Sequence, residues 1–150
     1  MNEIRLYSDG ACQPNPGKGG WAFIAKKGDE IIYQDQGFVA VTTNSRMELK
    51  AALEAIKYAI KEFPECDINI YSDSKYFVEG FNIWIYDWKE SGWRKSDGDK
   101  VQNLDLWKRL ASLKKGHRIF AFHVDGHSGH PENEYVDYLA VASIKDKVIK

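Results

Sequence analysis

The chain has few of the residues that mark unusual classes of protein. Its 150 residues include only two cysteines, Cys12 and Cys66, and four prolines. Two cysteines allow one disulfide at most and show no paired spacing, so a disulfide framework and a four-cysteine zinc site are excluded. We expect reduced thiols. The apolar fraction of 43% is too high for a disordered chain, and proline and glycine are too few for a fibrous one.

Long apolar runs are also missing. No stretch approaches the ~20 residues that a membrane helix needs, and residues 1–5 lack the apolar segment of a signal peptide. We therefore expect a cytoplasmic protein. The length suits one domain, because domains cluster near about 100 to 150 residues, so we predict a single domain over residues 1–150.

An excess of charge of one sign is absent as well. Lysine and arginine number 21 against 22 aspartates and glutamates, which gives a formal net charge of -1. A chain of this balance does not bind polyanions through its overall charge. Any contact with nucleic acid must therefore be local, through placed side chains or metal ions.

The spacing of apolar residues predicts a mixed α/β fold. Alternation predicts early strands at 3–8, 21–25 and 31–41, separated by turn sequences. From Leu49 the apolar period changes to three and four residues, which predicts a helix over 46–62 that Pro64 ends. We expect later strands at 68–71 and 120–124, helices at 75–79, 83–89, 104–114 and from Pro131 onward, and one sheet covered by helices.

Two of the predicted strands end in the same three residues. Tyr7-Ser8-Asp9 is repeated as Tyr71-Ser72-Asp73. If these strands pair in parallel, with the helix over 46–62 as the crossover, their ends lie about 5 Å apart and both carboxylates face one place. Ligand sites in α/β sheets favour such strand ends. Aspartate is also common wherever a strand turns, so the repeat alone leaves both interpretations open.

Two other acids extend this set. Glu48 closes a capping-box pattern that begins at Ser45, which is a structural explanation for it. Asp137 shares a helical stripe with apolar residues of 140–144, so its carboxylate is expected near the core. Carboxylates gathered without matching cations raise one another's pKa unless divalent cations compensate their charge. The set therefore indicates Mg²⁺ or Mn²⁺, which prefer oxygen ligands.

The histidines offer a different metal. His123, His127 and His130 are spaced by four and three residues, which is compatible with zinc. Glycines at 126 and 129 make this segment a loop, and a histidine in such a loop beside carboxylates is better placed for proton transfer. A histidine that merely faces solvent in a turn is the simpler alternative.

Six segments form one ordered set that runs almost from end to end of the chain: Tyr7–Gly10, Asn15–Gly17, Thr43–Leu49, Ser72–Ser74, Trp84–Trp93 and Gly126–Glu134. Taken together, these motifs resemble type 1 ribonuclease H. The resemblance implies a five-stranded mixed sheet flanked by helices. It also implies an endoribonuclease that hydrolyses the RNA strand of RNA/DNA hybrids by two-metal-ion in-line cleavage. The products would carry 5'-phosphate and 3'-hydroxyl ends, and two Mg²⁺ ions, replaceable by Mn²⁺, would be the cofactors. We expect a monomer whose partner is the hybrid duplex.

The resemblance also implies a role for individual residues. The metal-binding carboxylates of the family match Asp9, Glu48, Asp73 and Asp137, and its flexible-loop histidine matches His127. The substrate contacts that match are Cys12, Asn15 and Asn44 for the groove with the 2'-hydroxyls, Thr43 and Asn103 for a DNA phosphate, and Trp84, Trp88 and Ser96 for the DNA channel. Trp93 and Trp107 are expected to pack structurally.

The chain departs from the family in its charges. The segment 84–103 carries four basic and four acidic side chains where many relatives are strongly basic, and Val41 replaces an arginine of the phosphate pocket. Ser45 and Asp125 also differ from common family residues. We predict intact chemistry with weak or salt-sensitive binding of the hybrid. The alternatives are a hybrid-binding module without activity and another metal-dependent phosphoesterase.

Overall fold

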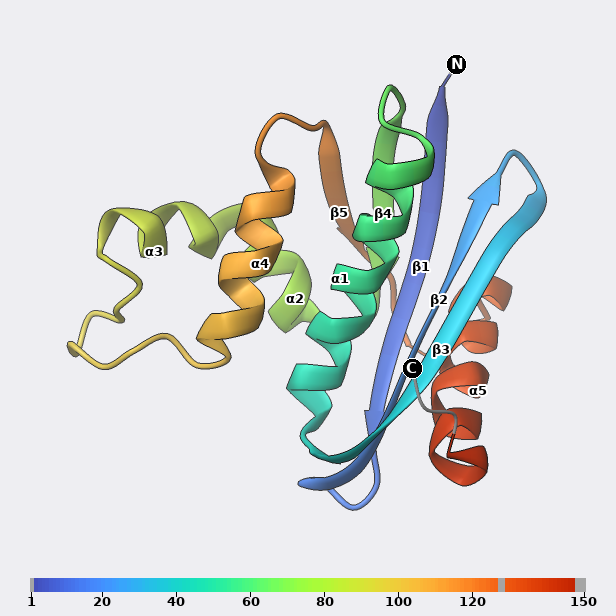
Figure 1. The fold of residues 1–150 in the computed structure, drawn as a ribbon, viewed down its shortest axis with the longest axis horizontal. Coiled ribbons are helices and arrows are strands. Elements are labelled where there is room, and N and C mark those ends of the chain that lie inside the picture. The colour runs from blue at the N-terminus through green and yellow to red at the C-terminus, as the bar shows by residue number, and fades with distance from the viewer. Residues whose placement is uncertain (1, 127–128, 148–150) are drawn as a thin grey trace.

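One mixed sheet of five strands organises the molecule. The computed structural model describes residues 2–126 and 129–147 (Figure 1). The strands run in the order β3-β2-β1-β4-β5 across the sheet. The first three are antiparallel neighbours, whereas β1, β4 and β5 are parallel. This confirms the predicted mixed sheet. The strands are β1 (Glu3–Cys12), β2 (Gly17–Lys27), β3 (Glu30–Thr42), β4 (Asp67–Ser72) and β5 (Ile119–His123).

Helices cover both faces of this sheet (Figure 1). On one face, side chains of β1, β2, β4 and β5 form a core with α1, α2 and α4. On the other face, α5 packs over β1 and β2. The helical elements are α1 (Asn44–Glu62), α2 (Lys75–Glu79), the π-helical turn η1 (Gly80–Trp84), α3 (Ile85–Glu90), α4 (Leu104–Lys114) and α5 (Pro131–Asp146).

The pairing of β1 with β4 confirms the parallel arrangement expected from the repeated motif. Ile4 lies opposite Ile68, and Tyr7 lies opposite Tyr71. Helix α1 lies between the two strands in the sequence, as the crossover prediction required. The buried isoleucines and Leu6 of this central pair all lie on one face of the sheet, in the core formed with α1, α2 and α4.

Two glycines bring the helices close to the sheet. A Cβ built on Gly10 would lie 2.3 Å from the carbonyl carbon of Met47, and one on Gly20 would lie 2.1 Å from the carbonyl oxygen of Ala140. Any larger residue would therefore push α1 or α5 away. The close approach matters because Glu48 and Asp137 lie on these same helices.

The capping-box prediction at Ser45 is wrong. Helix α1 begins at Asn44, and Thr43 is its cap, with its hydroxyl accepting a hydrogen bond from the backbone N–H of Arg46 at 3.2 Å. Both Thr43 and Ser45 are competent cap residues, so the local sequence does not choose between them. Because the helix starts earlier, Glu48 lies further into it and its carboxylate faces another element.

Strand β1 is longer than its apolar alternation predicts. It continues through Cys12, where it pairs with Gly19 of β2. Glycines carry no hydrophobic pattern, so the sequence does not reveal this part of the ladder. The predicted helix over 83–89 is also divided: its first residues belong to η1, and α3 starts at Ile85.

Smaller expectations can be checked directly. Both cysteines are free thiols. Trp107 is fully buried and Trp93 packs, half-buried, against the core, which confirms their structural interpretation. Within residues 2–126 and 129–147, none of the helices combines the length and the apolar character needed to cross a membrane.

Candidate active site

Four acidic residues from four elements approach one end of the central strands. Asp9 lies on β1, and Asp73 directly follows β4, its parallel neighbour. Glu48 comes from α1 and Asp137 from α5. The parallel pairing brings the first two together, and the close seating of α1 and α5 brings the other two to the same place.

Asp9 is at the centre of this group. It is 5% exposed, and its carboxyl is hydrogen-bonded to that of Asp137. Burial raises the pKa of Asp9 to about 9, with further increases from the negative charge of Asp73 and from Asp137. One favourable contact opposes this shift, a hydrogen bond of 2.9 Å from the backbone N–H of Gly10 to Oδ1. Without a cation, the carboxylates therefore come together by holding a proton.

Glu48 is held by a neighbouring hydroxyl. The Oγ of Ser74 donates to its Oε1 at 2.9 Å, and the same oxygen accepts the backbone N–H of Phe77 at 3.1 Å as the cap of α2. Burial raises the pKa of Glu48, the Ser74 hydrogen bond lowers it, and Asp73 raises it. Ser74 lies in the matching segment Ser72–Ser74 but was assigned no role of its own, although a serine directly before a helix is a common capping signal.

This donor set fits a hard divalent cation. It consists only of carboxylate oxygens, which Mg²⁺ and Mn²⁺ prefer. Among residues 2–126 and 129–147, no basic side chain contributes to the pKa shifts of Asp9 or Glu48, so a cation would supply charge that these residues do not. In the described part of the chain, no three histidine, cysteine or acidic side chains already have the spacing of a metal site. Because a carboxyl ligates a metal as the anion, a cation binding at Asp9 would release the proton that the raised pKa retains there.

The structure does not test the role predicted for the loop histidine. His127 is outside the described residues, so neither its role in proton transfer nor the zinc alternative is tested. The loop leading to it runs against the carboxylates: a Cβ built on Gly126 would lie 2.9 Å from Oδ2 of Asp73. His123, from the same zinc pattern, lies with its Nδ1 3.9 Å from Oδ1 of Asp125.

Two of the predicted groove residues meet directly. The side-chain oxygen of Asn15 accepts the backbone N–H of Asn44 at 3.1 Å, and both residues are exposed. Cys12 differs, since it is 5% exposed and its thiol donates to the backbone oxygens of Pro14 at 3.2 Å and Thr42 at 3.4 Å. The thiol therefore supports the loop from inside.

The predicted phosphate-pocket residues form a polar cluster at the start of α1. The Nδ2 of Asn103 donates to the Oγ of Ser45 at 3.3 Å, which lies 3.4 Å from the Oγ1 of Thr43. Arg46 donates to Oδ1 of Asn103 at 3.4 Å and forms two hydrogen bonds with Asp105 at 3.0 and 2.8 Å. Val41 lies nearby and is 83% exposed, so this surface position carries no charge. Sequence analysis did not predict the contact between Arg46 and Asp105, because these two residues lie far apart in the sequence.

The predicted DNA-channel tryptophans belong to an aromatic cluster. The rings of Trp84 and Trp88 lie 5.8 Å apart, and Trp88 meets the buried Trp107 edge-on at 5.3 Å. Tyr76 contacts Trp84 at 6.1 Å and Trp107 at 5.5 Å. Ser96 lies away from these rings in sequence, in the exposed turn between α3 and α4. Ring packing among Trp84, Trp88 and Trp107 therefore fixes the positions of the two predicted DNA-channel tryptophans.

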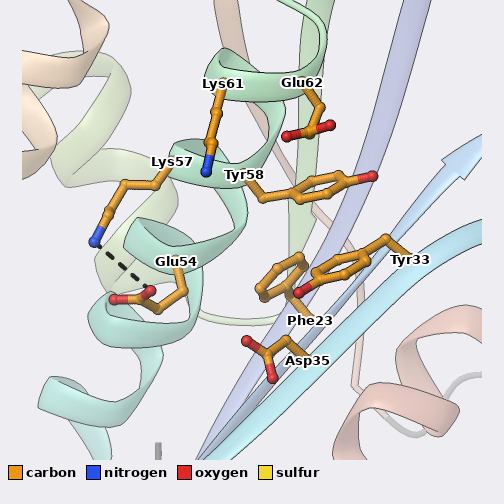
Figure 2. A pocket seen from close by; sticks show the side chains of 8 residues that line it. All are labelled: Phe23, Tyr33, Asp35, Glu54, Lys57, Tyr58, Lys61 and Glu62. Atoms are coloured by element: carbon orange, nitrogen blue, oxygen red, sulfur yellow. Dashed lines mark ion pairs between the residues drawn. The ribbon is translucent and has the colours of Figure 1, made fainter.

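A pocket of about 490 Å³ lies elsewhere, between α1 and strands β2 and β3 (Figure 2). We call it the α1–β3 pocket. The rings of Tyr33 and Tyr58 stack in it at 4.2 Å, and Lys57 lies 3.8 Å from Glu54. Its acids are thus interspersed with lysines. Its lining residues are Phe23, Tyr33, Asp35, Glu54, Lys57, Tyr58, Lys61 and Glu62.

Known proteins match both the sequence and the fold. The model of the RNase H family matches residues 1–145. A ribonuclease H of Cupriavidus metallidurans is 45% identical over 149 residues, which is 96% of this chain and 99% of the relative. A ribonuclease H of Rhodopirellula baltica is 44% identical over 144 residues, or 93% of this chain and 89% of the relative.

Solved structures agree with the sequence matches. LC9-RNase H1, described as a type 1 RNase H with the type 2 active-site motif, has a TM-score of 0.86 and 26% identity, covering 99% of this chain and 74% of its own. LC11-RNase H1 in complex with an RNA/DNA hybrid has a TM-score of 0.74 and 17% identity, covering 95% and 97%. The second likeness concerns the fold alone.

Proposed function

The chain belongs to the ribonuclease H family, and we propose that it is an endoribonuclease that hydrolyses the RNA strand of RNA/DNA hybrids. The observation that carries the proposal is the meeting of Asp9, Glu48, Asp73 and Asp137. Burial and neighbouring acids raise the pKa of Asp9 to about 9, which is the signature of carboxylates that need a cation.

Members of this family depend on divalent metal ions, and we assign two Mg²⁺ ions, with Mn²⁺ as a substitute, to these four carboxylates. Bound there, such ions supply an activated water and stabilise charge on the phosphate during in-line displacement. The carboxylates hold and separate the cations, and Ser74 keeps Glu48 turned toward them. The products are expected to carry 5'-phosphate and 3'-hydroxyl ends.

Proton transfer is assigned to His127. A neutral imidazole can accept and release a proton near neutral pH, and this residue lies one position after Gly126, whose backbone borders Asp73. Its proposed role is to move protons around the scissile phosphate and to assist departure of the product.

Selection of the hybrid is assigned to residues around the carboxylates. The paired Asn15 and Asn44 are exposed and offer polar groups for the 2'-hydroxyls that distinguish RNA from DNA. Thr43 and Asn103 are proposed to contact a DNA phosphate, and Trp84, Trp88 and Ser96 to line the DNA strand. Cys12 supports the groove from within. Because segment 84–103 is neutral and Val41 adds no charge, we propose weak or salt-sensitive binding.

A hybrid-binding module without activity is the rival function. All four carboxylates are retained, together with the Ser74 hydroxyl that holds Glu48, and a protein that only binds has no use for them. Another metal-dependent phosphoesterase would cleave duplex DNA or duplex RNA as well. We further propose that residues 1–150 act as one catalytic domain and as a monomer, in the cytoplasm.

The test uses an RNA strand labelled at one end, in a hybrid, single-stranded or in duplex RNA, with a duplex DNA control. Cleavage of the hybrid alone, dependent on Mg²⁺ and stopped by EDTA, is the expected result. Mg²⁺ should also raise the unfolding midpoint of the wild type but not of Asp9→Asn. Absence of hybrid cleavage by folded protein in both Mg²⁺ and Mn²⁺ would overturn the proposal in favour of the binding module.

A further inference from the structure

One tyrosine hydroxyl joins three segments near the proposed substrate contacts. The OH of Tyr76, on α2, accepts hydrogen bonds from Nε1 of Trp107 at 2.9 Å and from Nδ2 of Asn103 at 3.1 Å. It donates to the backbone oxygen of Gln102 at 3.5 Å. A phenol has one donor and two acceptor positions, so the hydroxyl is fully used.

Asn103 is in an unusual conformation for a helix cap. Its φ is 58° and its ψ 35°, the left-handed region that asparagine tolerates better than most residues. A cap asparagine normally bonds the first free N–H groups of its helix, yet Asn103 makes no such bond. Its amide instead lies between Tyr76 and Ser45. Capping therefore does not explain where this side chain points.

The ring of Tyr76 also packs against two tryptophans of the aromatic cluster. It contacts Trp84 at 6.1 Å and meets Trp107 edge-on at 5.5 Å. One side chain thus touches both groups to which DNA-strand contacts are assigned: the Asn103 amide through its hydroxyl and Trp84 through its ring.

We propose that Tyr76 is a positioning residue for substrate binding. It fixes the Asn103 amide relative to Thr43, Ser45 and the ring of Trp84. This inference rests on the proposed function, since it concerns the DNA strand of the same hybrid. Within the described residues, the hydrogen bonds of the Tyr76 hydroxyl go to Asn103, Trp107 and Gln102 and not to the four carboxylates, so its loss should affect binding of the hybrid and leave the chemical step unchanged.

The test is a double-mutant cycle of Tyr76→Phe and Asn103→Gly, the glycine retaining the left-handed backbone. Dissociation constants are measured in EDTA with a fluorescent hybrid, and kcat and KM in Mg²⁺. Tyr76→Phe should weaken binding and raise KM about five- to tenfold, as expected for a lost hydrogen bond, with kcat within about twofold. In the Asn103→Gly background it should add almost nothing, because its contact is already gone.

Two controls separate positioning from loss of stability. Phe77→Leu perturbs the buried side of the same helix without touching a hydroxyl, and Tyr58→Phe removes a phenol oxygen on α1. Both should leave hybrid affinity within about twofold. If Phe77→Leu weakens binding as much as Tyr76→Phe, or if the two changes in the cycle multiply, the positioning role is overturned.

The positioning role of Tyr76 and the proposed function can fail independently of each other. Should the wild type bind the hybrid but not cleave it, the catalytic proposal fails while the cycle of dissociation constants still decides the role of Tyr76. Should it cleave normally with Tyr76→Phe unchanged in affinity, only the positioning role fails.

Discussion

Two acidic regions of this molecule differ in how their charge is balanced. At the strand ends, Asp9 is buried against Asp73 and Asp137, and its pKa is raised to about 9. In the α1–β3 pocket, Oε1 of Glu54 lies 3.8 Å from Nζ of Lys57 (Figure 2), and its Oε2 lies 2.9 Å from Nζ of Lys50. The pocket has a volume of about 490 Å³, yet Glu54 within it is already paired.

Uncompensated buried charge, and not the volume of a cavity, therefore distinguishes the strand-end carboxylates from the α1–β3 pocket. A salt-bridged acid contributes modestly to stability and needs nothing further. Buried acids held together by a proton store repulsion that a metal ion relieves. A nucleic acid duplex is also bound on an open surface, so no enclosed cavity is required at the site.

The largest expected effect contrasts Asp9→Asn with Glu54→Gln. Asp9→Asn, which removes the central carboxylate of the proposed metal site, should lower kcat for hybrid cleavage by about 1000-fold or more. The same change in the pocket should leave kcat within about twofold. Both are measured by steady-state cleavage of a labelled hybrid in Mg²⁺. Comparable losses in the two variants would contradict the comparison.

The next effect is on the stability of the metal-free protein. The pKa of Asp9 is raised from its ordinary value of 3.8 to about 9, so the folded state holds a proton that the unfolded state releases. Stability due to this group is therefore lost as pH rises from about 4 to about 9. Asp9→Asn should remove that loss and stabilise the protein by about 1 to 3 kcal/mol at neutral pH.

Urea unfolding in EDTA at several pH values measures this effect. The stabilisation by Asp9→Asn should disappear near pH 4, where the unfolded aspartate is also protonated, while Glu54→Gln serves as the control. A stabilisation that does not change with pH would show that relief of charge repulsion is not its cause.

A smaller effect of opposite sign is expected at Glu132, an acid with a partner. Its hydrogen bond with Lys26, at 2.7 Å, is the main cause of its lowered pKa. A lowered pKa contributes stability above the unfolded value near 4.5, and this stability is lost as pH falls. Glu132→Gln should cost about 0.5 to 1 kcal/mol at neutral pH, and this cost should shrink as pH falls below about 4.5, by urea unfolding. A loss that persists at low pH would implicate packing instead.

The smallest effect belongs to the pocket itself. Lys57→Ala removes an exposed partner of Glu54 and should change the free energy of unfolding by less than about 0.5 kcal/mol. Hybrid affinity should also be unaffected, because the pocket is separate from the proposed substrate contacts. A marked loss of hybrid affinity, measured by fluorescence anisotropy, would show that this pocket contributes to substrate binding and would contradict the contrast between the two regions.

Much of the fold was predictable because it depends on local patterns. The repeated Tyr-Ser-Asp motif and the intervening periodicity predicted the parallel pairing of β1 and β4, and the register confirms it. The apolar stripe around Asp137 predicted an acid on a packed helix, and α5 lies against the sheet. The residues assigned to the site come from these patterns and from the family resemblance, and their roles stay predictions.

The prediction failed where two local solutions are equivalent. Thr43 and Ser45 are both able to cap a helix, and only the structure selects Thr43. The division of the 83–89 segment by η1 was also missed. A Cβ on Gly80 there would lie 2.2 Å from the ring of Trp107, so packing against a distant residue shapes this turn.

Hydrophobic period and motif order were enough to predict the order of the strands and helices, the crossover and the family. The hydrogen bonds of Ser74 with Glu48 and of Tyr76 with Asn103, and the burial that raises the pKa of Asp9, are seen only in the packed structure. Side-chain hydrogen bonds and burial depend on distances between elements, and a linear sequence does not specify those distances until the helices have packed on the sheet.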